Sequence, residues 1–144
     1  MGKKRIIRKS GGTVDAGLKS RSLARVAKKN IVVGTLHIHA TYNNTKVLLA
    51  DREGNTVAWS SSGALGFSGA KKGTPFAAAK VGELVGEKAN IIGIKEVDAV
   101  IRGVGAGRES ALRAFAGKGI DIVRIADDTP VPHNGPRPAK PRRV

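Results

Sequence analysis

Alternating apolar and polar residues in the first half of this sequence constrain its fold more than any other feature. From Val33 to Thr41 the two kinds alternate, with Leu36 and Ile38 among the apolar positions. A period of two over this length predicts a strand with one buried face. Apolar runs at 46–50 and 56–60 follow after turns rich in Asn, Asp and Gly. Because short turns join successive antiparallel strands, these three segments predict a meander.

The second half alternates between helix and strand patterns. A helix is predicted to start with Thr74 as its N-cap and Pro75 as its first helical residue. It continues to about Ala89, and Gly82 and Gly86 are its expected points of close packing. The later elements are a strand over 97–102, a glycine turn over 103–107, a helix over 108–117 and a strand over 120–126. The order β-β-β-α-β-α-β predicts a single α/β domain with a mixed five-stranded sheet and two helices, the outline of ribonuclease-H-like domains.

Positive charge is concentrated at the two ends of the chain. Of 26 basic and 11 acidic residues, ten bases and one acid fall in 1–30, and four bases and no acid in 129–144. Residues 31–128 hold twelve bases and ten acids. We therefore expect a basic N-terminal extension (1–30), a nearly neutral body (31–128) and a Pro-rich basic C-terminal tail (129–144). A formal charge of +15 makes nucleic acid the leading partner, on which both ends would become ordered.

Composition also excludes several classes of protein. With no cysteine, disulfide scaffolds and thiolate sites are ruled out. No apolar stretch approaches the ~18 residues of a membrane span, so no membrane partner is expected. The Arg- and Ser-containing first thirty residues also resemble an organelle transit peptide, which stays open as an alternative.

Two glycine-rich segments precede helices and are candidate phosphate sites. A phosphate contact is favoured at the second helix by the backbone N–H groups of Gly105 and Gly107 and by Arg108 at the helix start. A tight turn explains the two glycines equally well. Lys71 and Lys72 precede the cap at Thr74. Since a helix N-terminus already carries positive partial charge, two lysines there favour a bound anion, although both could simply be solvated.

The C-terminal segment pairs a turn with a stiff basic stretch. His133 and Asn134 begin it, and Asn134-Gly135 predicts a turn. The prolines that follow favour an extended rod, on which the basic side chains are Arg137, Lys140, Arg142 and Arg143. We expect this rod to thread into RNA; the alternative is a disordered tail that confers solubility.

A ribonuclease-H-like outline raises the alternative of a nuclease, which would need clustered carboxylates to hold metal ions. The first strand instead presents His37 and His39, and acids such as Asp51 and Asp98 are scattered. Two histidines can begin a zinc site, but further ligands are lacking. We therefore expect no enzyme, no cofactor and no metal.

Several motifs occur in one order along the chain. They are His37 to Thr45, Asp51 to Asn55, Trp59 to Ser61, Gly66-Phe67, Thr74 to Ala78, Gly103 to Ala111 and Asp128 to Gly135. Together they resemble the S-eleven family of small-subunit ribosomal proteins, and the ending Arg137-Pro138 with Pro141 to Val144 resembles its bacterial form. The resemblance covers about residues 28 to 144. It departs at Pro136, where the family usually has Cys, and residues 1–27 match no motif.

The resemblance implies a structural protein of the small-subunit platform, located in the cytoplasm within the ribosome and bound to small-subunit rRNA. It implies ribosomal proteins seven and eighteen as neighbours, with the mRNA path near the Shine–Dalgarno helix close by. Asn43 and Asn44, which match the first motif, become candidate RNA contacts. Lys28 and Lys29, where the resemblance begins, are further candidates.

Two rival functions remain at the level of sequence. A divergent ribonuclease-H-like hydrolase would cleave RNA with Mg²⁺ through Asp51 or Asp98. A DNA-packing protein would prefer duplex DNA, but such proteins spread positive charge over a wrapping surface, and the body here is nearly neutral.

Overall fold

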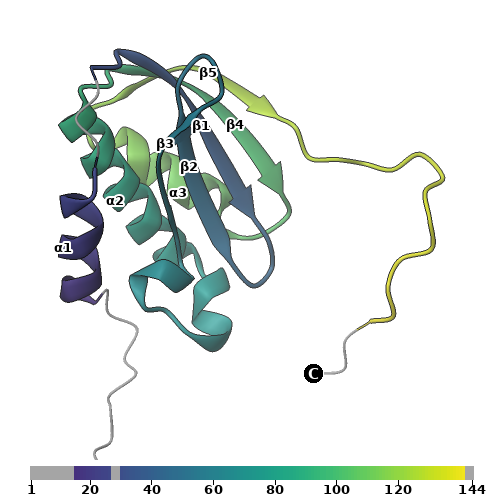
Figure 1. The fold of residues 1–144 in the computed structure, drawn as a ribbon. Coiled ribbons are helices and arrows are strands. Elements are labelled where there is room, and N and C mark those ends of the chain that lie inside the picture. Colours follow the sequence, from purple (N-terminus) through teal and green to yellow (C-terminus); the bar gives the residue numbers. More distant parts are fainter. Residues whose placement is uncertain (1–14, 27–29, 142–144) are drawn as a thin grey trace, which may run out of the picture.

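In a computed structural model that describes residues 15–26 and 30–141, the chain forms one five-stranded sheet and three α-helices (Figure 1). In chain order the elements are α1 (Ala16–Ala24), β1 (Val33–Ala40), β2 (Thr45–Ala50), β3 (Thr56–Ser61), the 3₁₀ helices η1 (Gly63–Leu65) and η2 (Gly69–Gly73), α2 (Pro75–Ile92), β4 (Glu96–Gly103), α3 (Gly107–Ala116) and β5 (Asp121–Asp127). This confirms the predicted α/β class.

The sheet is mixed, as the sequence predicted. Its strand order is β3-β2-β1-β4-β5. The first three strands of the chain pair antiparallel, whereas β4 pairs parallel with β1 and with β5. The meander therefore forms one half of the sheet, and the strands separated by helices form the other.

One face of the sheet is buried and the other is open. In β1, Leu36 and Ile38 are buried, while His37 and His39 between and beyond them are exposed. The helix α2 packs on β2 and β3, and α3 packs on β1 and β4. Apolar side chains of the buried face and of the two helices form the core.

The two long helices approach each other closely at glycines of α2. A β-carbon at Gly82 would overlap the backbone of Ala111, and one at Gly86 would lie 2.7 Å from Cγ of Lys118. Both predicted close-packing points are therefore confirmed. The helix also starts at its predicted cap, but it continues past Ala89 to Ile92.

The helix α1 was not predicted, so the expected number of two helices was wrong. Its N-cap is Asp15, whose carboxylate accepts the N–H of Gly17 at 2.9 Å. Leu23 and the following Val26 pack against the core. This pattern is short and lies among many charges, which is why the sequence did not reveal it. The boundaries proposed at residues 30 and 128 stay predictions.

The glycine-rich connection between β3 and α2 is more ordered than the predicted loop. It contains η1 and η2, and Phe67 between them is buried, with its ring edge-on to Phe76 at 6.1 Å between centroids. Because η2 ends one residue before the cap of α2, it holds Lys71 and Lys72 next to that helix N-terminus.

Candidate nucleic-acid interface

Four strands end at one edge of the sheet. The parallel strands β1, β4 and β5 end there at Ala40, Gly103 and Asp127, and β3, which runs in the same direction, ends there at Ser61. We call this end the carboxyl edge; it comprises the hairpin turn 41–44, the segment 69–75 and the glycine turn 103–107. Ligands of open α/β sheets bind at such edges, because loops and helix N-termini gather there.

The hairpin turn is held by its own backbone and by Thr41. The N–H of Thr41 donates to the carbonyl of Asn44 at 2.8 Å, and the N–H of Asn44 donates to Oγ1 of Thr41 at 3.1 Å. Asn43 is exposed, whereas Oδ1 of Asn44 is buried and accepts no hydrogen bond from the described residues. Of the two predicted contacts, Asn43 is therefore the accessible one, and Asn44 sits inside the turn.

Glycines allow the hairpin turn to pack between the segments that lead into α2 and α3. A β-carbon at Gly73 would overlap the carbonyl of Tyr42, and one at Gly105 would overlap that of Thr41. At Gly107 it would overlap the side chain of Thr45. Since no larger residue fits at these points, the glycines bring the N-termini of both helices beside the hairpin turn.

The N-terminus of α2 combines a capped helix with two lysines. Oγ1 of Thr74 accepts the N–H of Ala77 at 3.3 Å and donates to the carbonyl of Lys71 at 2.7 Å. The hydroxyl therefore fixes η2 onto the start of α2. Lys71 is exposed and Lys72 partly so, and both lie beside the positive end of the helix dipole. This geometry suits a phosphate.

Arg108 lies at the start of α3, but its guanidinium contacts the protein itself. Nη1 donates to the carbonyl of Gly103 and to Oγ1 of Thr129, the latter at 3.1 Å, and Nη2 forms an ion pair with Asp127. No side chain caps this helix in the described structure. Close approach explains Gly105 and Gly107, so a phosphate contact of this turn stays a prediction.

The partner of Arg108 is the last residue of β5. A hydrogen bond from Thr129 and then one from Arg108 stabilise the ionised carboxylate and lower the pKa of Asp127 to about 2. The next residues are held similarly, because Arg102 pairs with Asp128 at 2.7 Å and the N–H of Gly103 donates to Oγ1 of Thr129 at 3.2 Å. We call these contacts of Arg102, Gly103 and Arg108 with residues 127–129 the anchor of the tail. Sequence reasoning missed the anchor, since its two sides are far apart in the chain.

Beyond this anchor the tail leaves the body (Figure 1). The described residues 130–141 are all exposed, and no hydrogen bond joins them to the rest of the described chain. Asn134 has a left-handed φ of 56° and lies in a bend of the tail. His133, Arg137 and Lys140 lie along this segment, while Arg142 and Arg143, like Lys28 and Lys29, lie outside the described residues.

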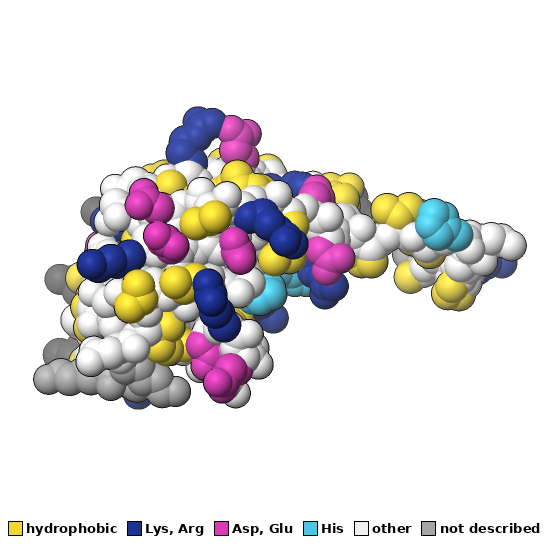
Figure 2. Space-filling model, turned by 90° about the horizontal axis from the view of Figure 1, so that it is seen from above, with side chains coloured by type: hydrophobic (Ala, Val, Ile, Leu, Met, Phe, Trp, Pro, Cys, Tyr) yellow, Lys and Arg dark blue, Asp and Glu magenta, His cyan; other side chains and the backbone are white. Residues whose placement is uncertain are grey.

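The surface of the body carries both signs of charge. Figure 2 shows basic and acidic side chains interspersed on the face that it presents, with the tail projecting to one side. Positive charge on this face is therefore balanced by acids, in line with the twelve bases and ten acids of residues 31–128.

A comparison with known protein families identifies the family of this chain. The family model for Ribosomal protein S11 matches residues 34–143, well over half of the chain. The chain belongs to the ribosomal protein S11 family.

Membership in the S11 family confirms the central functional expectations. The protein is a structural component of the small ribosomal subunit, takes part in translation and binds rRNA, and it works within the cytoplasmic ribosome. The S11 family is not an enzyme family. Among the described residues, no helix has both the length and the apolar character needed to cross a membrane.

The acids of this S11 chain do not converge on one site. The carboxylate of Asp51 accepts the N–H groups of Glu53 and Asn55 in the β2–β3 turn, at the opposite end from the carboxyl edge. Asp98 is exposed on β4, and Asp127 binds Arg108. Among the described residues, no group of three or more potential ligands is placed to hold a metal ion.

His37 and His39 line a shallow hollow on the open sheet face. It has a volume of about 400 Å³, and Lys46, Arg102 and Asp128 also line it. Both imidazoles are exposed on this face.

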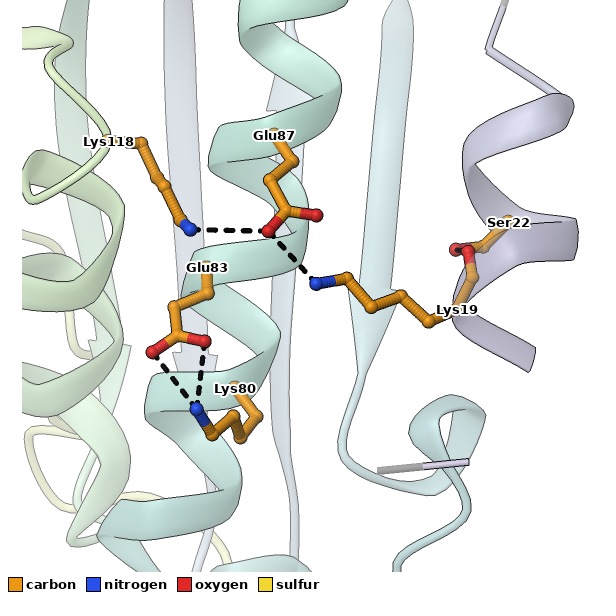
Figure 3. A network of polar contacts seen from close by, with 6 residues as sticks. All are labelled: Lys19, Ser22, Lys80, Glu83, Glu87 and Lys118. Atoms are coloured by element: carbon orange, nitrogen blue, oxygen red, sulfur yellow. Dashed lines mark hydrogen bonds and ion pairs between the residues drawn. The ribbon is translucent and has the colours of Figure 1, made fainter. Parts of the chain in front are cut away.

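The unpredicted helix α1 is tied to α2 by one carboxylate. Glu87 accepts from Lys19 of α1 at 2.9 Å and from Lys118 at 3.2 Å (Figure 3). Burial by itself raises the pKa of Glu87, but the two lysines outweigh it and hold that pKa below its ordinary value. This network holds α1 against α2.

Proposed function

We propose that this S11-family protein grips small-subunit rRNA with its carboxyl edge and its two basic ends. The observation that carries the proposal is the junction of the hairpin turn with both helix N-termini. One small surface thus combines Asn43, Lys71, Lys72 and the capped start of α2. Phosphate contacts there would position the body, because they are strong but carry no sequence information.

The anchor around Arg108 extends this surface into the tail. Asp127 and Thr129 hold the root of the tail against α3, so the tail departs from the carboxyl edge itself. The edge and the basic residues Arg137, Lys140, Arg142 and Arg143 would then engage neighbouring parts of one RNA. Arg108 in this view orients the tail instead of holding a phosphate.

The position in the subunit follows from the family resemblance. We place the protein in the platform of a bacterial-type small subunit, with ribosomal proteins seven and eighteen as neighbours. Its rRNA contacts would help shape the mRNA path near the Shine–Dalgarno helix. Lys28 and Lys29 would add contacts from the N-terminal side. Because Asp51 and Asp98 lie apart, we propose no catalytic role.

The carboxyl edge is tested by removing charge there and, separately, at the opposite end. Lys71→Ala with Lys72→Ala is compared with Arg52→Ala with Lys95→Ala, which removes two exposed bases from the other end of the sheet. Binding of a folded platform rRNA fragment is titrated between ~50 and ~200 mM salt. The first pair should weaken binding about tenfold and lower the salt slope by about 2, since two phosphate contacts are lost.

The control pair should change the affinity less than twofold. Equal losses for both pairs would show a diffuse electrostatic attraction and overturn the assigned edge. Random structured RNA and duplex DNA serve as competitors, and equal affinity for all three would contradict specific rRNA binding. Shortened RNA in the same samples would favour the hydrolase.

A further inference from the structure

One row of side chains crosses the open face of the sheet. In the strand register Trp59 pairs with Leu48, and Leu48 pairs with His37. His37 in turn pairs with Val100. Because residues paired across neighbouring strands point to the same face, these side chains of β3, β2, β1 and β4 lie next to one another. We call them the open-face row; it lies opposite the face on which α2 and α3 pack.

The open-face row presents rings and an apolar floor to solvent. Trp59 is 56% exposed, which is unusual for so large an apolar side chain, and His37 is exposed as well. Leu48 and Val100 are partly exposed and line the same hollow of about 400 Å³ as His37. Apolar side chains that lie together on a surface and are rimmed by polar ones mark a binding surface.

Polar side chains that suit RNA form the next row along the strands. Lys46 pairs with His39, and His39 pairs with Arg102. All three are exposed and line the hollow. Lys46 forms no ion pair among the described residues, whereas Asp128 neutralises Arg102. The ammonium of Lys46 is therefore available to a phosphate, beside an imidazole ring and a guanidinium plane.

The position of the tail favours a polyanion over a protein as the occupant. Asp128, which lines the hollow, directly follows β5, and the Pro-rich segment that carries Arg137 and Lys140 comes after it. An RNA strand that follows this basic segment toward the body therefore arrives at the hollow. An apolar protein surface would match the floor of the row but would leave Lys46 and the basic tail without a partner.

The rings of the row select unpaired RNA. In a duplex the bases are stacked on one another, so a sheet face meets only phosphates and sugars, and Trp59 and His37 would stay unused. Unpaired bases instead stack on Trp and His rings and on Arg planes, which is how open sheet faces with such side chains bind single strands.

We propose that the open-face row binds a short unpaired RNA segment of about two nucleotides, with one base on Trp59, the next on His37 and a phosphate on Lys46. This rests on the proposed RNA-binding function and adds a second contact region to it. Because every base has a flat face, the row would recognise the absence of pairing rather than the identity of the base.

Since Trp59 is the only tryptophan in the chain, its fluorescence reports directly on this row. The full chain is titrated at ~200 mM salt, which weakens phosphate contacts of the basic ends, with a single-stranded RNA of about eight nucleotides. Stacking should quench the fluorescence saturably. A fully paired RNA of the same length should need at least about tenfold more for half-quenching, because its bases do not reach the ring.

Two variants test the other members of the site by the same fluorescence. His37→Ala should raise the concentration for half-quenching about fivefold or more, the order expected for one stacked base. Lys46→Ala should raise it about threefold or more through the lost phosphate contact. Lys95→Ala is the matched control, because Lys95 is also exposed but lies at the other end of the sheet, and it should change the value less than twofold.

Trp59 itself is tested with a fluorescently labelled RNA, whose anisotropy does not depend on the tryptophan. Trp59→Ala should weaken binding of the single strand about fivefold or more. Ile91→Ala removes another large apolar side chain, 54% exposed on α2, and should change the affinity less than twofold. Melting temperatures of both variants confirm that each is folded.

Several results would overturn the assignment. Binding of the single strand without quenching would place the RNA on the basic ends alone. Equal quenching by single-stranded and paired RNA, or displacement by a polyglutamate peptide of equal length and concentration, would show a general anion surface. Equal affinities of Trp59→Ala and Ile91→Ala would leave the row as a surface for a protein partner.

The platform-fragment titration separates this proposal from the function on which it rests. If that fragment binds specifically and Trp59 does not respond to single-stranded RNA, the assignment of the open-face row fails and the function stands. If the fragment does not bind, the function fails, whatever Trp59 shows.

Discussion

The two segments that flank the body have similar charge and opposite structures. Residues 15–26 carry three bases and one acid, yet they form α1 and fold back onto α2. Residues 130–141 carry two bases and no acid, and they run outward with every residue exposed. Charge therefore does not decide whether such a segment joins the body.

Apolar side chains and backbone chemistry make the difference. Leu23 and Val26 reach the core, and a capped helix satisfies the backbone of α1. The tail has five prolines between 130 and 141, which remove N–H donors and prevent a helix, and its one larger aliphatic residue, Val131, is 71% exposed. Carboxylates help to hold both segments, Glu87 for α1 and both Asp127 and Asp128 for the root of the tail.

The largest expected effect comes from ending the chain after Thr129. Four bases are removed, so affinity for the platform rRNA fragment should fall on the order of a hundredfold and the salt slope by about 3 to 4. The melting temperature should stay within about 2 °C, because the described residues that are lost, 130–141, are all exposed. Filter binding and calorimetry measure the two quantities. A drop of many degrees would mean that the tail packs on the body.

A middle-sized effect is expected for Leu23→Ala in α1. Loss of its partly buried side chain should lower the free energy of unfolding by about 1–2 kcal/mol, below the range for a full core position. Urea denaturation gives this value, and amide exchange should speed up in α1. In the tail, Val131→Ala is the matched change and should stay within about 0.5 kcal/mol. Equal losses in the free energy of unfolding for Leu23→Ala and Val131→Ala would show that α1 and the tail pack on the body to the same extent.

The smallest effect concerns the carboxylates of Glu87 and Asp127. Both have pKa values below the ordinary ones, so each attachment is complete at neutral pH and weakens on acidification. The stabilisation from Glu87 is lost as the pH falls below about 4.5, the ordinary pKa of this group. The stabilisation from Asp127 is lost as the pH falls from 3.8, its ordinary pKa, to about 2. Carboxyl NMR titration should show both midpoints. In Arg108→Ala the midpoint of Asp127 should rise toward 3.8; an unchanged midpoint would show that Arg108 does not hold the tail.

Much of the fold was predictable from local patterns. Alternation in β1, the Thr74 cap with Pro75 and the glycine turn before α3 all depend on residues within one turn or strand of each other. The family resemblance of the motifs also pointed to the correct family, which the match over residues 34–143 confirms. The candidate RNA contacts remain predictions.

Contacts between distant residues account for what could not be foreseen. Arg108 looked like a phosphate ligand beside its own glycine turn, but β5 brings Asp127 and Thr129 within its reach. Likewise, Lys88 meets Trp59 because α2 crosses the edge strand.

Periodicity, caps and glycines of the chain were enough to specify its five strands, its two longer helices and its class, because these signals act over a few bonds. Which cations face a carboxylate and which face open space depended on how the elements pack. That packing joins residues such as Lys19 and Glu87, 68 positions apart, which no local pattern encodes.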